Sequence, residues 1–261
     1  MQARSALFDL YGDHLRERGG VAPIAALVRL MAALDVAAPA VRTAVSRMAR
    51  QGWLVPTPTE RGPGYALTDR ATRRLDEAAS RIYRSHGERP WDGRWAIALL
   101  PHTADRSRRE RVQRGLEYLG YRQLHQDTWV APRPTPELES VTRAESLSPT
   151  CFIAEHVGND AELIALWQPE ELADRYQQWL DKAERTVLAA GDDPDDETAF
   201  AARSELVHEW RKFLFADPGL PRQLLPADWP GDAAASYFDA NAARLAPGAA
   251  RFVSQCLAGP A

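Results

Sequence analysis

The stretch PAVRTAVSRMAR, residues 39–50, has the spacing of an α-helix with two unlike faces. Its apolar residues recur at helical spacing and form one face that can pack on other helices: Val41, Ala44, Val45 and Met48. The opposite face contains no acidic residue and consists of Arg42, Thr43, Ser46, Arg47 and Arg50. Side chains of these types read base edges in the major groove of DNA. The stretch is therefore either a DNA-recognition helix or an ordinary surface helix with solvated arginines.

The segments on either side of this helix favour DNA recognition. Two helices are predicted before it, over residues 5–16 and 23–34, and a helix is predicted after it over 68–85. Between them, a strand at 53–55 and a return strand at 65–67 enclose a turn-rich segment. This order is that of a winged helix-turn-helix, in which Arg61 is the basic residue of the wing.

Charge is unevenly distributed along the chain. The formal net charge is −4, but residues 1–85 carry 13 basic and 8 acidic side chains, a surplus of five positive charges. Residues 86–261 carry 19 basic and 28 acidic side chains, a surplus of nine negative charges. A basic segment in an otherwise acidic chain indicates a polyanionic partner for that segment.

The composition predicts a globular protein of the cytoplasm. Of its 261 residues 45% are apolar and 26% charged, and no run of about 18 apolar residues exists that could span a membrane. The N-terminal residues lack the pattern of a signal peptide. Two cysteines, Cys151 and Cys256, exclude a disulfide framework and a four-cysteine metal site.

The predicted secondary structure changes in character near residues 92 and 159, so that three domains are predicted. Residues 92–158 alternate strands and helices in the order βαββαβ, which is that of a ferredoxin-like domain. Residues 159–261 are predicted to be helical, with a helix over 197–216 and a last helix that ends near Leu245. The predicted fold class is α+β: a winged helix-turn-helix with its following linker helix over 1–85, the ferredoxin-like middle domain over 92–158, and the helical C-terminal domain over 159–261.

Five stretches of the chain together resemble one known family. They are LFDLYGD (7–13) with RGG (18–20), VRTAVSRM (41–48), QGWL (51–54), WDGRW (91–95), and HEWRKFLF (208–215) with DP (217–218) and LLPADWPG (224–231). In this order, and over nearly the whole chain, they resemble the PaaX family, the transcriptional repressors of phenylacetate catabolism. The resemblance implies the same three domains, assembled as a homodimer. It also implies release from DNA by an aryl-acyl-CoA thioester, typically phenylacetyl-CoA.

The chain departs from this family in its wing. Family wings often carry several arginines before the return strand, whereas residues 57–64 contain Arg61 alone. Phosphate contacts from the wing are therefore expected to be weak, and DNA affinity is expected to depend more on the recognition helix.

Two sets of site residues follow. The predicted DNA-binding residues are Arg42, Thr43, Ser46, Arg47, Arg50 and Arg61. A CoA thioester needs cationic contacts for its phosphates and an apolar pocket for its aryl group. The effector-binding residues predicted on that basis are Trp91, Arg94, Trp95, Trp210 and Arg211. The alternative for the tryptophans in this set is that they build a core between domains.

Catalytic chemistry has no motif in this sequence. The chain contains no glycine-rich phosphate loop and no HExxH motif, and its six histidines are scattered singly, so we predict neither a metal site nor a cofactor. A metal-dependent nuclease built on the ferredoxin-like fold needs a carboxylate at the end of the first strand, where residues 99–102 read LLPH. The chain is therefore predicted not to be an enzyme.

The sequence thus predicts a ligand-responsive repressor that binds a palindromic double-stranded operator as a homodimer, with an aryl-acyl-CoA as its effector. Three alternatives stay open. The first is a regulator of the same architecture for another aromatic or acyl-CoA pathway. The second is an enzyme that acts on a CoA thioester or a nucleic acid, and the third is a DNA-binding architectural protein without an effector.

Overall fold

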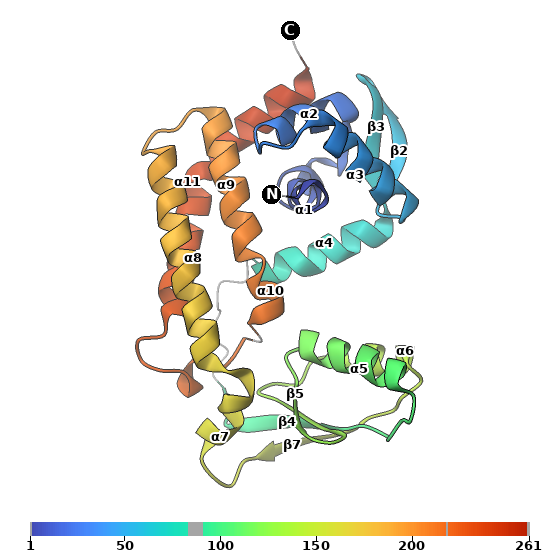
Figure 1. Cartoon of the computed structure of the whole chain (residues 1–261), viewed down its shortest axis with the longest axis vertical. Helices are drawn as coiled ribbons and strands as arrows, with labels where there is room; N and C mark the ends of the chain where they lie inside the picture. Colours follow the sequence, from blue (N-terminus) through green and yellow to red (C-terminus); the bar gives the residue numbers. More distant parts are fainter. Residues whose placement is uncertain (1, 83–90, 218, 260–261) are drawn as a thin grey trace. The chain divides into compact units, whose positions relative to one another are not determined.

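The computed structural model describes residues 2–82, 91–217 and 219–259 (Figure 1). Within them the protein has the predicted α+β architecture, with a three-stranded and a four-stranded sheet. Contacts divide the described residues into two compact units. Unit 1 comprises those within 1–85, 177–212 and 232–261, and unit 2 those within 86–176 and 213–231. The end of the helix predicted over 68–85 lies outside the described residues, and the predicted domain boundaries stay a prediction.

The N-terminal part of unit 1 has the element order of a winged helix-turn-helix, as predicted. Three helices precede a β-hairpin and a fourth helix: α1 (Ala3–Asp9), α2 (Ile24–Ala32), α3 (Ala38–Arg50), β2 (Leu54–Thr59), β3 (Gly62–Leu67) and α4 (Asp69–Ile82). The first helix is not regular throughout, because it continues from α1 as a π-helical segment (Leu10–Leu15) and a short 3-10 turn (Arg16–Arg18). Gly19 and Gly20 then end it with positive φ angles, which glycine adopts without strain.

A short third strand joins the hairpin and was not predicted. β1 (Val21–Pro23) pairs with β3 and extends the sheet to the order β1-β3-β2. Gly64 permits this pairing, because a Cβ atom at that position would lie 2.7 Å from the carbonyl oxygen of Ala22. Three residues that end in proline carry too little periodicity to identify a strand.

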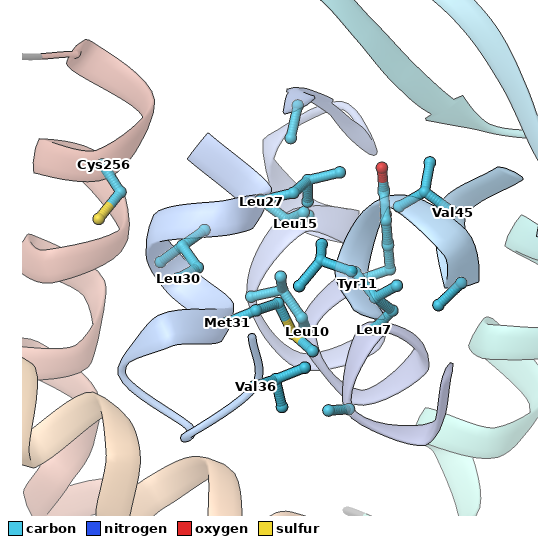
Figure 2. Close-up of a cluster of buried hydrophobic side chains, with 14 of the residues drawn as sticks. Leu7, Leu10, Tyr11, Leu15, Leu27, Leu30, Met31, Val36, Val45 and Cys256 are labelled. Atoms are coloured by element: carbon cyan, nitrogen blue, oxygen red, sulfur yellow. The ribbon is translucent and has the colours of Figure 1, made fainter. Parts of the chain in front are cut away.

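The core of unit 1 encloses the first helix (Figure 2). Leu7, Leu10 and Tyr11 are at most 2% exposed and pack with residues of α2 and α3. Figure 2 also shows Cys256 on the last helix of the chain, which belongs to the same cluster. A fully buried leucine stabilises a fold by about 1.5–3 kcal/mol. The winged helix-turn-helix therefore shares its hydrophobic core with the C-terminal end of the chain.

The C-terminal part of the chain contains three long helices, and two predictions about its helices were wrong. The long helices are α8 (Pro169–Ala190), α9 (Asp196–Trp210) and α11 (Pro230–Ala258). The single helix predicted over 197–216 is broken after Trp210, where a turn separates α9 from the short α10 (Phe213–Ala216). The last helix does not end near Leu245 but continues through Pro247. A proline inside a helix costs about 3 kcal/mol. Burial of Ala249 and Val253 in the core of unit 1 offsets this cost, since neither is exposed to solvent.

Unit 2 has the predicted ferredoxin-like order. Its elements are β4 (Arg94–Leu99), α5 (Arg106–Tyr118), β5 (Arg122–His125), β6 (Thr128–Ala131), α6 (Leu138–Ala144) and β7 (Thr150–Glu155). All neighbouring strands are antiparallel, in the order β5-β6-β4-β7. Helices α5 and α6 cover one face of this sheet (Figure 1), where Ala96, Ala98 and Trp129 meet Val112 and Leu116. The other face carries Trp95 and Val130, which pack on α7 (Asp160–Ile164) and the 3-10 turn Ala165–Trp167.

Candidate nucleic-acid interface

Helix α3 has the two faces that its sequence predicts. It begins with Pro39 in its first turn, where the missing N–H of proline costs no hydrogen bond. Val41, Val45 and Met48 are at most 1% exposed, because this face packs on α1 and α2. The five polar residues predicted for the opposite face are all exposed: Arg42, Thr43, Ser46, Arg47 and Arg50.

The cations of this exposed face are not neutralised by the protein itself. Among the described residues, no ion pair joins Arg42, Arg47 or Arg50 to a carboxylate, and the helix contains no acidic residue. The Thr43 hydroxyl donates a hydrogen bond to the carbonyl oxygen of Pro39 at 2.9 Å, so its oxygen keeps its role as an acceptor. The exposed face of α3 thus offers unpaired guanidinium groups and small polar side chains to a ligand.

The wing holds the sixth predicted residue, Arg61, at the tip of the β2–β3 hairpin. Thr59 stabilises this tip, since its hydroxyl donates to the carbonyl oxygen of Gly62 at 2.8 Å and accepts from the amide of Arg61 at 3.3 Å. The Arg61 guanidinium lies beside the end of α11, where a Cβ at Gly259 would come within 2.5 Å of its Nη1. The structure therefore brings five predicted residues onto one helix face and leaves Arg61 on a separate element.

Two buried aspartates at the start of the chain bind α9, and sequence reasoning did not identify them. Asp9 is 7% exposed and bonds His208 Nδ1 at 2.7 Å and a guanidinium nitrogen of Arg211. The other Arg211 nitrogen donates to the Ser5 hydroxyl at 3.1 Å. One signal was present, since the LFDLYGD stretch places an aspartate among residues that a helix would bury.

The second aspartate forms the more complete ion pair. Arg203 donates from Nε and Nη2 to the two carboxylate oxygens of Asp13, at 2.9 and 2.8 Å. Only 5% of the Asp13 side chain and 13% of the Arg203 side chain are exposed. Arg203 Nη1 also donates to the carbonyl oxygen of Ala242 on α11. The bidentate pair therefore links the first helix of the chain to α9 and α11.

His14 lies next to this pair and makes the stability of the protein depend on pH. Burial lowers the pKa of His14 from 6.5 to about 4, although Asp13 acts in the opposite direction. The unfolded chain therefore binds one more proton than the folded chain between these values, and stability falls as the pH decreases through that window. We expect a loss of about 2 kcal/mol from this residue between pH 7 and pH 5.

Urea unfolding at several pH values tests this expectation. His14→Gln should flatten the dependence between pH 6.5 and 4, while His102→Gln should leave it unchanged, because the His102 side chain is 75% exposed. If both variants keep the slope of the natural protein, His14 is not the residue that titrates on unfolding.

The residues predicted to bind an effector are engaged within the protein. Trp210 is 6% exposed and lies 4.9 Å, ring to ring, from Phe238, and Arg211 is paired with Asp9 in unit 1. In unit 2, Arg94 donates to the Asp92 carboxylate from Nε and Nη2 at 2.9 and 2.7 Å. The two members that remain, Trp91 and Trp95, lie 5.3 Å apart by ring centroids. Effector binding by this set stays a prediction.

Two other findings concern metals and membranes. Within residues 2–82, 91–217 and 219–259, no cluster of three or more histidine, cysteine or acidic side chains could hold a metal ion. None of the helices described there combines the length and the hydropathy that a membrane span requires.

Three family matches follow one another along the chain. Residues 2–71 match the PaaX-like protein family, residues 88–164 match the PaaX protein central Cas2-like domain, and residues 167–255 match the PaaX-like protein C-terminal domain. Together these matches run from the first helix to near the end of α11. The exposed face of α3 lies inside the first of them.

Similar proteins are found by sequence and by structure. Over 264 aligned residues the chain is 30% identical to the transcriptional repressor PaaX of Escherichia coli (strain K12), and the alignment covers 96% of this chain and 83% of that protein. Its fold is similar to that of the uncharacterized protein Rv0674 from Mycobacterium tuberculosis, with a TM-score of 0.63 and 22% identity. That match covers 97% of this chain and 99% of the other, and at this identity it shows the fold alone.

Proposed function

This chain belongs to the PaaX-like family of transcriptional regulators, and from that premise we propose that it is a repressor that binds a palindromic operator as a homodimer and is released by a small-molecule effector. Membership in this family implies a regulator rather than an enzyme. The observation that carries the proposal is the exposed face of α3, which presents arginines without acidic neighbours. The site of action is the cytoplasm, where the operator DNA lies.

Each monomer places residues 39–51 in a major groove. Arg42 and Arg47 contact bases or the flanking phosphates, as do Thr43 and Ser46 through their hydroxyl groups. The Thr43 hydroxyl already donates within the helix, so it acts on DNA as an acceptor or through its methyl group. Arg50 and Arg61 contact phosphates and hold the helix in register. Two-fold symmetry of the homodimer then requires two half-sites of inverted sequence.

An aryl-acyl-CoA such as phenylacetyl-CoA is the effector that the family membership favours. The relative from Escherichia coli is named a transcriptional repressor. A ligand can release a repressor only if it binds the DNA-free conformation more tightly than the DNA-bound one. A regulator of the same architecture for another aromatic or acyl-CoA pathway would share every feature described above and would differ in the ligand that releases it.

A mobility-shift titration tests this function. Duplex DNA that the protein selects from a random library serves as the operator, so that no operator sequence has to be assumed. Phenylacetyl-CoA is then added to the complex, with free phenylacetate and unrelated acyl-CoA compounds as matched controls. We expect phenylacetyl-CoA to release the DNA at concentrations at which free phenylacetate does not.

The other outcomes discriminate between the alternatives. Release by a different acyl-CoA would support the same mechanism in another pathway. A complex that no compound releases would contradict ligand response and favour an architectural DNA-binding protein. Hydrolysis of the added thioester or cleavage of the DNA would contradict a purely regulatory function.

A further inference from the structure

One strand of unit 2 is not covered by the helices that cover its neighbours. In the antiparallel register, Ile153 on β7 lies opposite Ala96 on β4, and Cys151 lies opposite Ala98. Paired residues point to the same face of a sheet, so all four lie on the side of α5 and α6. Ala96 and Ala98 are at most 3% exposed, whereas Ile153 is 50% exposed and Cys151 is also exposed.

The position of α6 explains why β7 stays uncovered. A Cβ at Gly115 of α5 would lie 2.4 Å from the Val141 Cγ1 of α6, so only a glycine lets these helices pack this closely. Beyond the end of α6, Arg111 of α5 bonds both carboxylate oxygens of Glu145, each at 2.8 Å. These contacts hold α6 on α5, and the sheet extends one strand further than its helical cover.

A cavity of about 480 Å³ occupies this place. Its buried wall is formed by side chains of β4, α6 and the segments between the strands, and Ala96, Tyr121, Leu138 and Leu147 among them are at most 8% exposed. The exposed residues Cys151 and Ile153 of β7 form part of its opening. Pockets for small molecules are commonly of about 300–1,000 Å³ and largely apolar, with a few polar groups that orient the ligand.

The polar groups that line the cavity include a phenol and an ion pair. Burial raises the pKa of the Tyr121 phenol above its usual value, so the phenol is neutral at physiological pH. Arg143 and Glu139, one helical turn apart on α6, pair with each other, and their side chains are 71% and 73% exposed. Such an exposed pair contributes little to stability, so an anionic ligand can take the place of Glu139 beside Arg143 at little cost.

Two of the tryptophans predicted to bind an effector, Trp91 and Trp95, lie across the sheet from this cavity. Trp95 precedes Ala96, and neighbouring residues of a strand point to opposite faces. Trp95 is 1% exposed, and its indole N–H donates to Asp160 at 3.1 Å. The indole N–H of Trp91 lies 2.9 Å from the carbonyl oxygen of Pro132, to which it donates. Both indoles therefore have a structural role that leaves no donor for a ligand.

We propose that the cavity between β7, β4 and α6 is the effector site, which takes the aromatic or short acyl group of an anionic acyl compound and holds its anionic part beside Arg143. The inference rests on the proposed function, because it locates the binding site of the effector that would release the operator DNA. A free carboxylic acid carries its negative charge on the acyl group itself, whereas a CoA thioester carries it on the CoA phosphates, so the two sources are compared below. The opening at β7 leaves a tail larger than the cavity in solvent, so the site admits either compound.

Alkylation of Cys151 by iodoacetamide reports directly on occupancy of the cavity. Cys151 lines the opening and is exposed, whereas Cys256 is 6% exposed in the core of unit 1, so the two thiols differ in access. Phenylacetyl-CoA, phenylacetate and coenzyme A are tested separately, and equilibrium dialysis gives the Kd of each. At ten times its Kd a bound compound leaves about one site in eleven open, so alkylation should slow about tenfold. An unchanged alkylation rate under a compound that binds would overturn the inference.

Two tryptophan variants of the same strand separate the cavity from the rest of β7. Ile153→Trp fills the cavity from a half-exposed position, so it should raise the Kd of the compound at least about tenfold without unfolding the protein. Two variants serve as controls. Thr150→Trp places the same side chain on the opposite face of the sheet. Arg94→Ala removes a residue of the effector-binding set that was predicted from the sequence. Both should change the Kd less than about twofold, since each is a substitution at an exposed position. Unchanged binding by Ile153→Trp, or lost binding by Arg94→Ala alone, would contradict the assignment.

The readouts distinguish a wrong location from a wrong function. Operator release by a compound that leaves Cys151 unprotected supports the proposed function and overturns the cavity as its site. Protection of Cys151 without operator release supports the cavity and contradicts repression through this ligand. If dialysis detects no binding of any of the three compounds, the inference that the cavity binds anionic acyl compounds is wrong.

Discussion

Replacing Arg203 with alanine is expected to destabilise the protein by about 3–5 kcal/mol, because it leaves the buried Asp13 carboxylate without its partner. Asp13 accepts two hydrogen bonds from the Arg203 guanidinium, and 5% of its side chain is exposed. The same substitution removes the hydrogen bond from Arg203 to Ala242, which holds α11. Urea unfolding followed by circular dichroism measures the loss.

A matched arginine in the same unit serves as the control. Arg251 also forms an ion pair, with Asp196, but its side chain is 62% exposed. Because exposed pairs often contribute nothing measurable, Arg251→Ala should leave the unfolding midpoint unchanged. The double variant Asp13→Asn, Arg203→Met should lose less stability than Arg203→Ala, since it leaves no unpaired charge in the interior. Equal losses for Arg203→Ala and Arg251→Ala would show that the buried pair does not hold the helices together.

Removing Arg42 and Arg47 together is expected to abolish preference for the operator while leaving weak binding to unrelated DNA. One bidentate contact between an arginine and a base contributes about 1–3 kcal/mol of discrimination, so two should contribute about 2–6 kcal/mol. Both side chains are exposed on α3 and unpaired among the described residues, so the fold should not change. Mobility shifts on the selected operator and on a scrambled duplex measure the ratio of the two affinities.

Single variants separate base contacts from phosphate contacts. Arg47→Ala should reduce operator affinity more than non-specific affinity, whereas Arg50→Ala should weaken both by a similar factor and reduce the salt dependence of binding. Arg185→Ala on α8 removes another exposed positive charge from the same unit and should change neither affinity. If Arg47→Ala weakens binding to both DNAs equally, Arg47 does not read bases.

Much of the fold followed from local patterns in the sequence. The two faces of α3 were predicted residue by residue, because a period of 3.6 residues separates Val41 and Val45 from Arg42 and Ser46. The βαββαβ order of unit 2 was also predicted, since short apolar segments alternate with amphipathic ones there. Strand β1 and the course of α11 beyond Pro247 were missed, because both depend on packing partners that a local pattern does not contain.

The candidate site also has a part that the sequence predicts and a part that it does not. The DNA-facing residues of α3 could be predicted because their chemistry and their spacing occur within a single helix. The partners of Asp9 and Asp13 could not, since His208, Arg211 and Arg203 are separated from them by about two hundred residues of sequence. The cavity of unit 2 was equally hidden, because it arises where α6 stops short of a strand.

The sequence by itself therefore determined the order of the elements, the polarity of the recognition helix and the family to which the chain is similar. Only the tertiary structure decided that the LFDLYGD stretch pairs with α9, that α11 completes the core of the winged helix-turn-helix, and that β7 borders an open cavity. The physical reason is the range of the interactions. Helical and strand periodicity are set within a few residues, whereas buried ion pairs and cavities depend on which distant surfaces the whole chain brings together.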